Sequence, residues 1–367
     1  MPRPRYERLT TERVNPRTRA LDRLSPRAIA RLMNAEDRRA VAAVGRVAPA
    51  IAAAVERIVA ALRGGGRLFF VGAGTSGRLG VIEAAECPPT FGTRPGLVQA
   101  IMAGGRQSVF RSREGAEDDA PAAARAVRAR VRRGDVVVGV SASGVTAFVH
   151  GALSTAAARG AGTVLVQCTA RPIGAALRRA GRPIVIAPVP GPEVLAGSTR
   201  LKAGTATKLV LNTLTTASMT RLGKVYGNRM VDLQPRSAKL RARAERLVAE
   251  LGGVDRRARN LHCEPPAATR GSRSSWCAGT CRPVPLPAPC GRLAAPCAWC
   301  WNSDRPASVP AVRGHVPCST VVRAYHTLCL APGLSRPSRP DRGHRLARPA
   351  RGLQGWNLFT MRRAAAG

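Results

Sequence analysis

The residues from Gly72 to Phe91, GAGTSGRLGVIEAAECPPTF, combine hydroxylated side chains with an isolated carboxylate. Small hydroxylated residues at the start of a helix favour phosphate, because free backbone N–H groups and the helix dipole both attract an anion. Glu86 follows ten residues after Ser76, beside Cys87-Pro88-Pro89. A carboxylate placed there could exchange a proton with the molecule that carries the phosphate. The segment therefore predicts acid–base chemistry on a phosphorylated ligand.

The elements that must position this segment alternate between apolar runs and helical stretches. Five short apolar runs predict strands over 68–71, 97–102, 136–140, 163–167 and 184–187. The helical stretches between them include 77–85, 120–132 and 146–159. Buried strands separated by helices are typical of a parallel sheet covered on both faces. We therefore expect an α/β fold with a doubly wound, five-stranded parallel sheet flanked by helices.

Two loops of small and hydroxylated residues follow predicted strands. They are Gly74-Thr75-Ser76-Gly77 and Ser141-Ala142-Ser143-Gly144. Ligands of doubly wound sheets bind beyond the carboxyl ends of the strands, so we expect both loops at the binding edge. The first loop is not Gly-x-Gly-x-x-Gly, and no acidic ribose-binding residue follows about twenty residues on. This argues against a dinucleotide, and we expect no cofactor.

Helical patterns also flank the predicted sheet. One begins at Ser25-Pro26 and runs to about Arg46, and a second fits 49–63. Beyond the last strand, helical patterns cover about 200–222 and 237–251. We expect an N-terminal helical segment (1–63), a sheet domain (64–222), a C-terminal helical segment (223–259) and a separate tail (260–367).

The net charge of +38 does not by itself indicate nucleic-acid binding. The chain has 55 arginines and four lysines, a ratio typical of GC-rich coding DNA, and only three tyrosines to stack on bases. No apolar run approaches the length that spans a bilayer, and no apolar signal segment follows the basic N-terminus. We expect a cytoplasmic protein without nucleic-acid or membrane partners.

The composition changes near residue 260. Residues 260–367 hold eight of the ten cysteines, all four tryptophans and three of the 21 acidic residues, without a sustained helical or strand period. Such composition is typical of out-of-frame translation of GC-rich DNA. Read in a shifted frame, Pro266 to Trp276 can encode Gly-Gly-Asp-Ala-Arg-Val-Ala-Val-Val-Met, a turn and an apolar segment. We interpret the tail as frameshifted and as disordered or irregular.

A metal module is the alternative interpretation of the tail. The pairs with ligand-like spacing are Cys277 and Cys281, Cys297 and Cys300, His315 and Cys318, and His326 and Cys329. No strand or helix pattern of a zinc module accompanies them, and a disulfide framework requires a secreted context. We expect no metal at the site in the front part of the chain.

GAGTSGRLG and AECPPTFG together resemble the signature of the N-acetylmuramic acid 6-phosphate etherases, within the sugar isomerase (SIS) domain group. Other pieces agree in the same order over about residues 8–256. They are Thr11-Glu12-x-x-Asn15-Pro16, Glu114-Gly-Ala-Glu-Asp118, Val189-x-Gly191-Pro-Glu193, Gly197-Ser-Thr-Arg-Leu-Lys202-Ala-Gly-Thr205 and Gly223-Lys-Val-Tyr-Gly-Asn228. In this family a small helical region follows, and it contains a Gly-Gly-Asp turn and an apolar helix. The shifted reading of the tail is similar to that region.

The resemblance implies cleavage of the D-lactyl ether of N-acetylmuramic acid 6-phosphate with water. The products are N-acetylglucosamine 6-phosphate and D-lactate, and the context is recycling of cell-wall amino sugars. It implies that Glu86 is the proton donor to the leaving lactate and that Glu117 is the second catalytic carboxylate. The apolar neighbours of Glu86 lead us to expect that desolvation raises its pKa.

Phosphate contacts are expected from both loops, and these are Gly74, Thr75, Ser76, Ser143, Gly144 and Thr146. The second loop departs from the family pattern, which usually has Arg and Pro where this chain has Val145 and Ala147. The segment Pro235-Arg236-Ser237 also departs, because it replaces a segment that usually carries Thr-Asn. These departures concern substrate affinity and leave both carboxylates in place.

Other polar residues have simpler interpretations. Glu83 and Glu114 are expected on a helix surface or in a structural role. Cys87 and Cys168 are expected as small buried residues rather than nucleophiles. Arg200 and Lys202 are either additional counter-charges for phosphate or surface residues.

Two alternatives to the etherase remain open at this stage. The chain is either a non-catalytic SIS regulator that senses a sugar phosphate, or an inactive product of a frameshifted gene. A sensor needs the phosphate loops but not two carboxylates, so the pair Glu86 and Glu117 favours the enzyme. Because SIS domains commonly pair, we also expect a homodimer that binds a small sugar phosphate.

Overall fold

The computed structural model describes residues 9–233 and 237–252. Its main sheet has five parallel strands in the order β2-β1-β3-β4-β5. The strands are β1 (Leu68–Gly72), β2 (Val98–Met102), β3 (Val136–Val140), β4 (Gly162–Val166) and β5 (Ile184–Ile186). A short antiparallel pair, β6 (Val225–Tyr226) and β7 (Arg229–Met230), follows later in the chain. The expected doubly wound five-stranded parallel sheet is confirmed.

Eight α-helices accompany the strands in the described part of the chain. They are α1 (Pro26–Gly45), α2 (Ala48–Arg63), α3 (Gly74–Phe91), α4 (Ala120–Arg130), α5 (Ala147–Ala158), α6 (Ala175–Gly181), α7 (Lys202–Arg221) and α8 (Ala238–Gly252). Short 3₁₀ turns add η2 (Thr10–Glu12), η3 (Pro16–Thr18), η4 (Leu21–Arg23), η5 (Arg106–Val109) and η6 (Ala116–Asp118). The sequence patterns did not indicate α6 or these turns, because such short segments carry too few apolar repeats to show a period.

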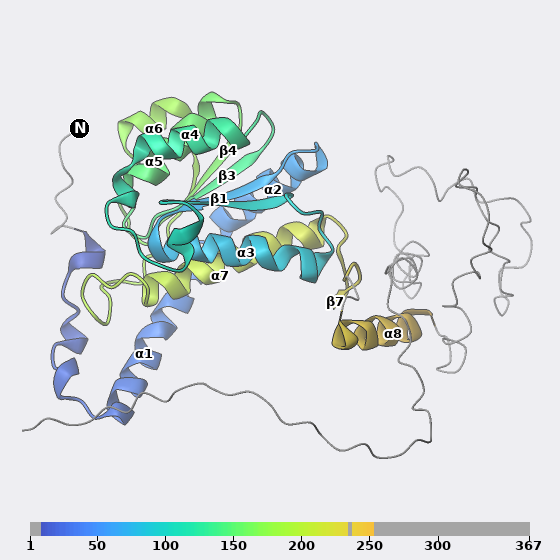
Figure 1. The fold of residues 1–367 in the computed structure, drawn as a ribbon. Coiled ribbons are helices and arrows are strands. Elements are labelled where there is room, and N and C mark those ends of the chain that lie inside the picture. Colours follow the sequence, from blue (N-terminus) through green and yellow to red (C-terminus); the bar gives the residue numbers. More distant parts are fainter. Residues whose placement is uncertain (1–8, 234–236, 253–367) are drawn as a thin grey trace, which may run out of the picture. The chain divides into compact units, whose positions relative to one another are not determined.

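Helices cover both faces of the sheet (Figure 1). On one face, α2, α3 and α7 pack against alternate strand residues such as Leu68, Phe70 and Val138. On the other face, α4, α5 and α6 pack against residues of opposite orientation, such as Phe69 and Val137. Since both faces are buried, β1 and β3 are apolar throughout, as parallel strands usually are.

Helix α3 is longer than the sequence predicted. We expected it to end before Pro88 and Pro89, but it continues to Phe91. Each proline removes one N–H donor to the preceding turn, a loss that falls in the last turn, where Ala85 is exposed to water. The helix then ends at Gly92, whose φ of 61° is left-handed and whose N–H donates to the Pro88 carbonyl at 3.0 Å.

The binding edge lies where the strand order reverses, between β1 and β3. Gly72 and Val140 are register partners at the carboxyl ends of these strands. From that edge β1 leads into α3 and β3 leads into α5, which cover opposite faces of the sheet. Neighbouring strands whose connections diverge leave a crevice at their carboxyl ends, which is the usual ligand position in such folds. The two predicted loops therefore begin side by side.

Close approach of α3 to β1 requires small residues. A Cβ at Gly80 would lie 2.7 Å from the Phe70 Cβ, and one at Gly77 would lie 2.5 Å from the Gly72 carbonyl oxygen. Because no side chain fits there, the start of α3 is pressed against the end of β1. A glycine also permits close packing between β3 and α5, because a Cβ at Gly139 would lie 2.7 Å from Val149 Cγ1.

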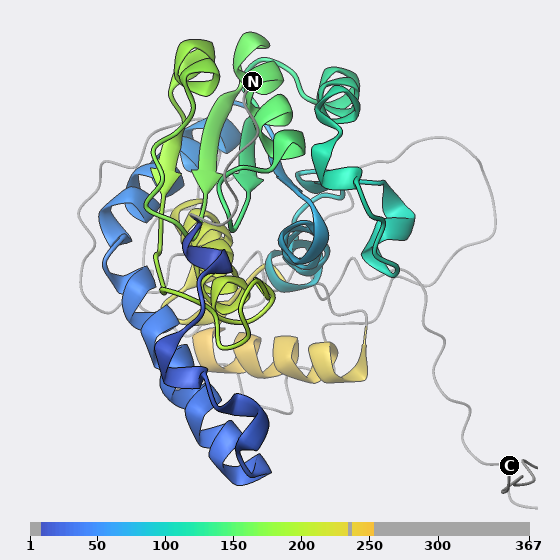
Figure 2. The same cartoon turned by 90° about the vertical axis from the view of Figure 1, so that its left-hand side faces the viewer.

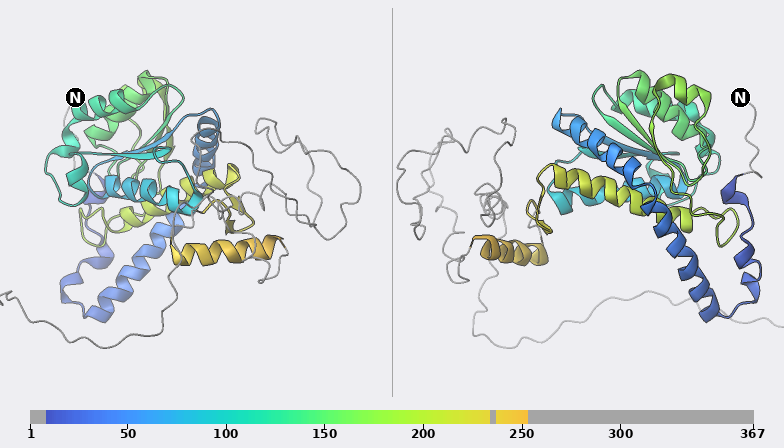
Figure 3. Two further views of the ribbon diagram at one scale, coloured as in Figure 1. Left: turned by 45° about the vertical axis from the view of Figure 1, so that its right-hand side comes forward. Right: turned by 180° about the vertical axis from the view of Figure 1, so that it is seen from behind.

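The N-terminal turns lie beside α1 and the loop before α7 (Figure 2). The Gly197 N–H donates to the Thr11 carbonyl at 3.0 Å, and the Thr18 hydroxyl donates to the Val194 carbonyl at 2.8 Å. Helix α1 packs along α7, and α7 lies beside α3 beneath the sheet (Figure 3). The N-terminal residues thus hold the segment that leads into α7.

Candidate active site

The start of α3 offers unengaged backbone donors. Ala73 is the N-cap, no side chain caps the helix, and the first helical bond runs from the Gly77 N–H to the Ala73 carbonyl. The N–H groups of Gly74, Thr75 and Ser76 therefore precede the hydrogen-bonded helix, where the positive end of the helix dipole lies. Such an end is suited to an anionic group.

The second loop is held by its own hydroxyl groups. Ser141 Oγ lies 2.8 Å from Thr146 Oγ1 and accepts the Gly144 N–H at 3.1 Å. Ser143 Oγ accepts the Val145 N–H at 3.3 Å. Thr146 is the N-cap of α5 without a side-chain cap bond, so the first N–H groups of α5 also remain unengaged by side chains. Both loops have the features of an anion site, and their individual phosphate contacts stay predictions.

His150 supports this loop and was not singled out from the sequence. Its Nε2 lies 3.0 Å from the Gly144 carbonyl oxygen. Burial lowers the pKa of His150, and the positive charge of Arg171 lowers it further, against the opposing effect of the Gly144 hydrogen bond. The ring is therefore neutral near pH 7, with its proton on Nε2 to donate to Gly144. No motif in the sequence around His150 would have identified it as a residue that supports this loop.

A cavity of about 190 Å³ joins the start of α3 to the loop that carries Glu117. It is lined by Ala73 and Gly74 from the first loop, by Arg78 from α3 and by Glu114 and Glu117. Arg78 donates from Nε to the Val109 carbonyl at 2.7 Å and from Nη2 to the Ser108 carbonyl at 3.0 Å. The arginine thus fastens this loop to α3, and Glu117 lies beside the predicted phosphate site.

Glu117 has a perturbed carboxyl group. The residue is exposed at the rim of the cavity, yet partial desolvation raises its pKa, and the negative charges of Asp118 and Glu114 raise it further. A carboxylate with a raised pKa is a stronger base once ionised, and groups with such shifts concentrate at functional sites. Glu114 is exposed and lines the same cavity, so its charge is part of the site environment.

Glu86 does not share this cavity. It is exposed on α3, twelve residues after Gly74, which corresponds to about 18 Å along the helix axis. The expected desolvation of Glu86 by its apolar neighbours is wrong for this chain, because α3 turns Glu86 to solvent and Cys87 to the core. Cys87 is 2 % exposed, and burial raises its pKa to about 12, with the charges of Glu83 and Glu86 adding to the effect.

Lys202 is not a surface residue, and its role as a counter-charge for phosphate stays a prediction. It is buried at the start of α7, where Nζ donates to Glu36 Oε2 at 2.5 Å. Asn15 donates to the same carboxylate oxygen at 2.9 Å, and Glu193 accepts the backbone N–H groups of Lys202 and Ala203 at 2.8 and 2.9 Å. Glu193 therefore caps α7 with a buried carboxylate. Arg200, by contrast, is exposed.

Glu83 and Cys168 are structural. Glu83 is buried, accepts from Lys208 Nζ at 2.5 Å and accepts from the Thr215 hydroxyl at 2.7 Å, so it ties α3 to α7. Cys168 is 1 % exposed, and burial raises its pKa to about 12. These observations confirm the structural interpretation of Glu83 and the buried state of both cysteines.

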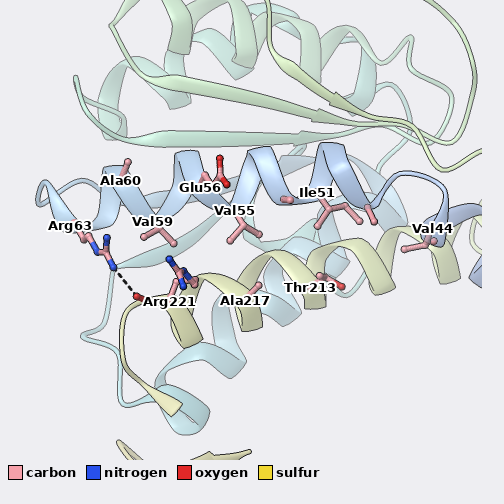
Figure 4. Close-up of a pocket in the computed structure, with 13 residues that line it drawn as sticks. Val44, Ile51, Val55, Glu56, Val59, Ala60, Arg63, Thr213, Ala217 and Arg221 are labelled. Atoms are coloured by element: carbon pink, nitrogen blue, oxygen red, sulfur yellow. Dashed lines mark hydrogen bonds between the residues drawn. The ribbon is translucent and has the colours of Figure 1, made fainter. Parts of the chain in front are cut away.

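A larger groove of about 710 Å³ runs between α2 and α7 (Figure 4). Aliphatic residues such as Val44, Ile51, Val55 and Ala217 line most of it. Apolar side chains suit another protein surface better than a sugar phosphate, which needs hydrogen-bond donors. The groove is therefore a poorer candidate for the active site than the start of α3.

Within 9–233 and 237–252, no group of three or more His, Cys, Asp or Glu side chains is arranged to hold a metal ion. Among the helices of the same residues, none is both long and apolar enough to cross a bilayer. The Cys and His pairs of the tail, the expected tail structure and Pro235-Arg236 lie outside the described residues.

Comparison with known proteins first defines the class. Residues 50–157 match the family profile described as the glucokinase regulatory protein N-terminal SIS domain. A solved phosphoheptose isomerase, GmhA from Neisseria gonorrhoeae, is 20 % identical, with a TM-score of 0.40 over 53 % of this chain and 100 % of that one. The matched profile, the doubly wound sheet and the two loops at its binding edge define an SIS-domain protein.

Closer relatives define the family. The N-acetylmuramic acid 6-phosphate etherase of Gloeobacter violaceus is 54 % identical over 256 residues, which are 70 % of this chain and 82 % of the relative. The protein of the same name from Symbiobacterium thermophilum is 51 % identical over 68 % of this chain and 81 % of its own length. The chain belongs to the N-acetylmuramic acid 6-phosphate etherase family.

Proposed function

We propose that this chain cleaves the D-lactyl ether of N-acetylmuramic acid 6-phosphate with water, which yields N-acetylglucosamine 6-phosphate and D-lactate. The observation that carries the proposal is the identity of about half of all residues over four fifths of the etherases' length. The cavity that places Glu117 beside the start of α3 supports it. This activity belongs to the recycling of cell-wall amino sugars.

The reaction follows from the chemistry of the substrate. The open-chain sugar has an aldehyde at C1, which acidifies the proton on C2. A base removes that proton, the electron pair forms the C2–C3 double bond, and the C3–O bond breaks. The departing lactate oxygen takes a proton from an acid, because an alkoxide is a poor leaving group. Water then adds to C3, C2 regains a proton, and N-acetylglucosamine 6-phosphate results.

We assign the two proton transfers to Glu117 and Glu86. Glu117 is the base at C2, and its raised pKa supports this role. Glu86 is the acid that protonates the departing lactate. Each positioned acid or base contributes roughly 10²- to 10⁴-fold to the rate.

The phosphate is held by the two loops. The first contributes Gly74, Thr75 and Ser76 at the start of α3, and the second contributes Ser143, Gly144 and Thr146 before α5. The unengaged N–H groups of both helix starts support this assignment. Val145 and Ala147 supply no additional charge to the second loop, so phosphate binding there depends on backbone and hydroxyl donors.

The partner of the site is a small sugar phosphate, and we expect the protein to act as a homodimer in the cytoplasm. A non-catalytic sugar-phosphate sensor is the second candidate, because the matched family profile is that of a regulatory protein's SIS domain. The sensor requires neither Glu86 nor Glu117. Catalysis therefore separates the two candidates.

The direct test is release of D-lactate from N-acetylmuramic acid 6-phosphate by the purified chain and its variants. We expect Glu86→Gln and Glu117→Gln each to lower kcat by about 10²-fold or more. Glu56→Gln is the matched control, because Glu56 is an exposed carboxylate on α2. Substrate binding without lactate release by the unaltered chain would favour the sensor, and full activity of Glu86→Gln would refute that assignment.

A further inference from the structure

The second phosphate loop has no charge of its own. Residues 141–147, Ser-Ala-Ser-Gly-Val-Thr-Ala, contain no charged side chain, and the only titratable residue of α5 is His150. His150 is neutral near pH 7, since burial lowers its pKa. A phosphate monoester carries about −1.5 to −2 charges at that pH, which the roughly +0.5 of a helix end does not balance. A permanent cation beside this loop would therefore strengthen phosphate binding.

The segment that follows β4 lies directly against this loop. Strands β3 and β4 pair in parallel, so the second loop and the segment after β4 leave the sheet at the same edge. The Cys168 N–H donates to the Ala142 carbonyl at 2.9 Å. The Thr169 hydroxyl donates to the Ser143 carbonyl at 3.3 Å. The segment after β4 is therefore part of the same binding edge.

One side-chain amide joins Gly144 to Arg171. Gln167 is buried, and its Nε2 donates to the Thr169 carbonyl at 3.0 Å and to the Arg171 carbonyl at 2.6 Å. The Oε1 of the same amide lies 2.7 Å from the position that a Cβ at Gly144 would take. Because both contacts belong to one planar group, Gln167 holds the backbone of Arg171 close to the second loop.

Arg171 contributes positive charge at this place. Its side chain is exposed, and the ion pairs between described residues do not include it. Its charge acts on His150, the residue whose ring contacts the Gly144 carbonyl. Such an effect requires proximity, because water and salt screen exposed charges that are far apart. Arg171 thus adds to the positive potential beside Gly144 and the start of α5.

We propose that Arg171 binds the phosphate of the sugar at the second loop and that Gln167 positions it there. The inference rests on the proposed function, since it names the cation for the phosphate of that substrate. A guanidinium carries a rigid fork of N–H donors that matches two phosphate oxygens, and it stays charged at every physiological pH. The loop supplies neutral donors, and Arg171 supplies the charge. Together they select a sugar phosphate over the unphosphorylated sugar.

Substitution of Arg171 tests the proposal. The product N-acetylglucosamine 6-phosphate serves as the binding probe, and calorimetry measures its Kd. We expect Arg171→Gln to raise this Kd by about 10-fold or more, because one charge-assisted contact to phosphate is lost. For N-acetylmuramic acid 6-phosphate the loss should appear more in KM than in kcat, since the phosphate is remote from C2 and C3.

The charge at position 171 should set the affinity in a graded way. Arg171→Lys keeps the charge but loses the fork, so its Kd should lie between those of the unaltered chain and Arg171→Gln. Arg171→Glu should bind more weakly than Arg171→Gln, because it repels the phosphate. Arg128→Gln is the matched control, an exposed arginine in the last turn of α4, and it should bind as the unaltered chain does. A purely structural role of Arg171 would not follow this order of charge.

Gln167 is tested through Arg171. Gln167→Met removes the amide that holds the Arg171 carbonyl, and we expect weaker binding of N-acetylglucosamine 6-phosphate. In an Arg171→Gln background the same substitution should cost little more, because coupled residues are not additive. An equal loss in both backgrounds would contradict the positioning role of Gln167.

The outcomes separate this inference from the proposed function. If Arg171→Gln binds the probe as tightly as the unaltered chain, or if Arg171→Glu binds no more weakly than Arg171→Gln, the inference is overturned while the etherase activity stands. If the unaltered chain neither binds the probe nor releases lactate, the proposed function itself fails.

Discussion

Glu117 illustrates how the immediate surroundings of a residue decide its chemistry. Three acidic side chains, Glu114, Glu117 and Asp118, follow Gly104 and the η5 turn within one short loop. Partial desolvation raises the pKa of Glu117, and the negative charges of Asp118 and Glu114 raise it further, so its ionised form is a stronger base. The same chain turns Glu86 to solvent.

The charge of Asp118 should be visible in the pH dependence of kcat/KM. As a base, Glu117 works when ionised, so the rate falls as the pH drops through its pKa. Asp118→Asn removes one negative neighbour, lowers that pKa and should move the acidic limb to lower pH, while Glu117 itself stays in place. The remote exposed residue Asp22 gives the control variant Asp22→Asn. An acidic limb that moves to higher pH would contradict this account.

At the scale of the elements, most of the fold was predictable from pattern alone. The apolar runs located all five strands of the main sheet within one residue or so at each end, because buried parallel strands are continuous apolar segments. The helix α6 and the 3₁₀ turns were not predictable, since their residues are fixed by contacts with other elements. The predicted helix ended at residue 85, before Pro88 and Pro89. Helix α3 instead continues through both prolines to Phe91, where Gly92 caps it.

Tight contact between β1 and α3 should make Gly80 intolerant of a methyl group. Gly80→Ala places a Cβ 2.7 Å from the Phe70 Cβ, and we expect the free energy of unfolding to fall by about 1–3 kcal/mol. Because α3 must then shift, lactate release should fall as well. Urea denaturation measures the first effect.

Gly45→Ala is the control for this substitution. Nothing lies within 4 Å of a Cβ at Gly45, which is in α1, so the gain in helix propensity of at most about 1 kcal/mol should prevail. If Gly80→Ala were as stable as Gly45→Ala, the close approach of α3 to β1 would not hold in solution.

The buried pair of Glu36 and Lys202 should be costly to break from one side. Lys202→Met leaves the Glu36 carboxylate buried without its main partner, and we expect a loss of about 3–5 kcal/mol in the free energy of unfolding. The double variant Glu36→Gln/Lys202→Met should recover part of this loss. Lys239→Met, at an exposed position in α8, should have little effect. Urea denaturation of the four proteins measures these differences.

The same pair predicts a pH dependence. Burial alone would raise the pKa of Glu36, but the hydrogen bonds from Lys202 and Asn15 and nearby positive charge lower it below its ordinary value of 4.5. The stabilisation is therefore present above that ordinary value and is lost as the pH falls through the lowered pKa. Glu36→Gln should flatten the fall in stability at acidic pH. An unchanged acidic slope would contradict the pairing.

At the scale of the whole molecule, the sequence could locate two candidate phosphate loops and the motif of the family, but it could not show which distant residues meet. Asn15, Glu36 and Lys202 come from three separate segments, and only the fold reveals that they share one buried cluster. Likewise, the sequence places Glu86 and Glu117 in one reaction through resemblance, whereas the fold separates them. The separation is a property of α3, whose length carries Glu86 away from the binding edge.

The matched relatives also bear on the end of the chain. The similarity to the Gloeobacter violaceus etherase spans 82 % of that relative but 70 % of this chain, so each sequence also holds residues outside the match. We expect resequencing of the gene around codons 255–270 to reveal a single-base difference that restores a helical end of the family type. An unshifted reading frame together with zinc in the purified protein would instead support the metal module.

The most direct measurement of the central claim is product analysis of N-acetylmuramic acid 6-phosphate treated with the purified protein in heavy-oxygen water. Our account predicts D-lactate and N-acetylglucosamine 6-phosphate in equal amounts, with the heavy oxygen on C3 of the sugar and none in the lactate. A folded protein that releases no lactate, or one that places the heavy oxygen in lactate, would contradict it.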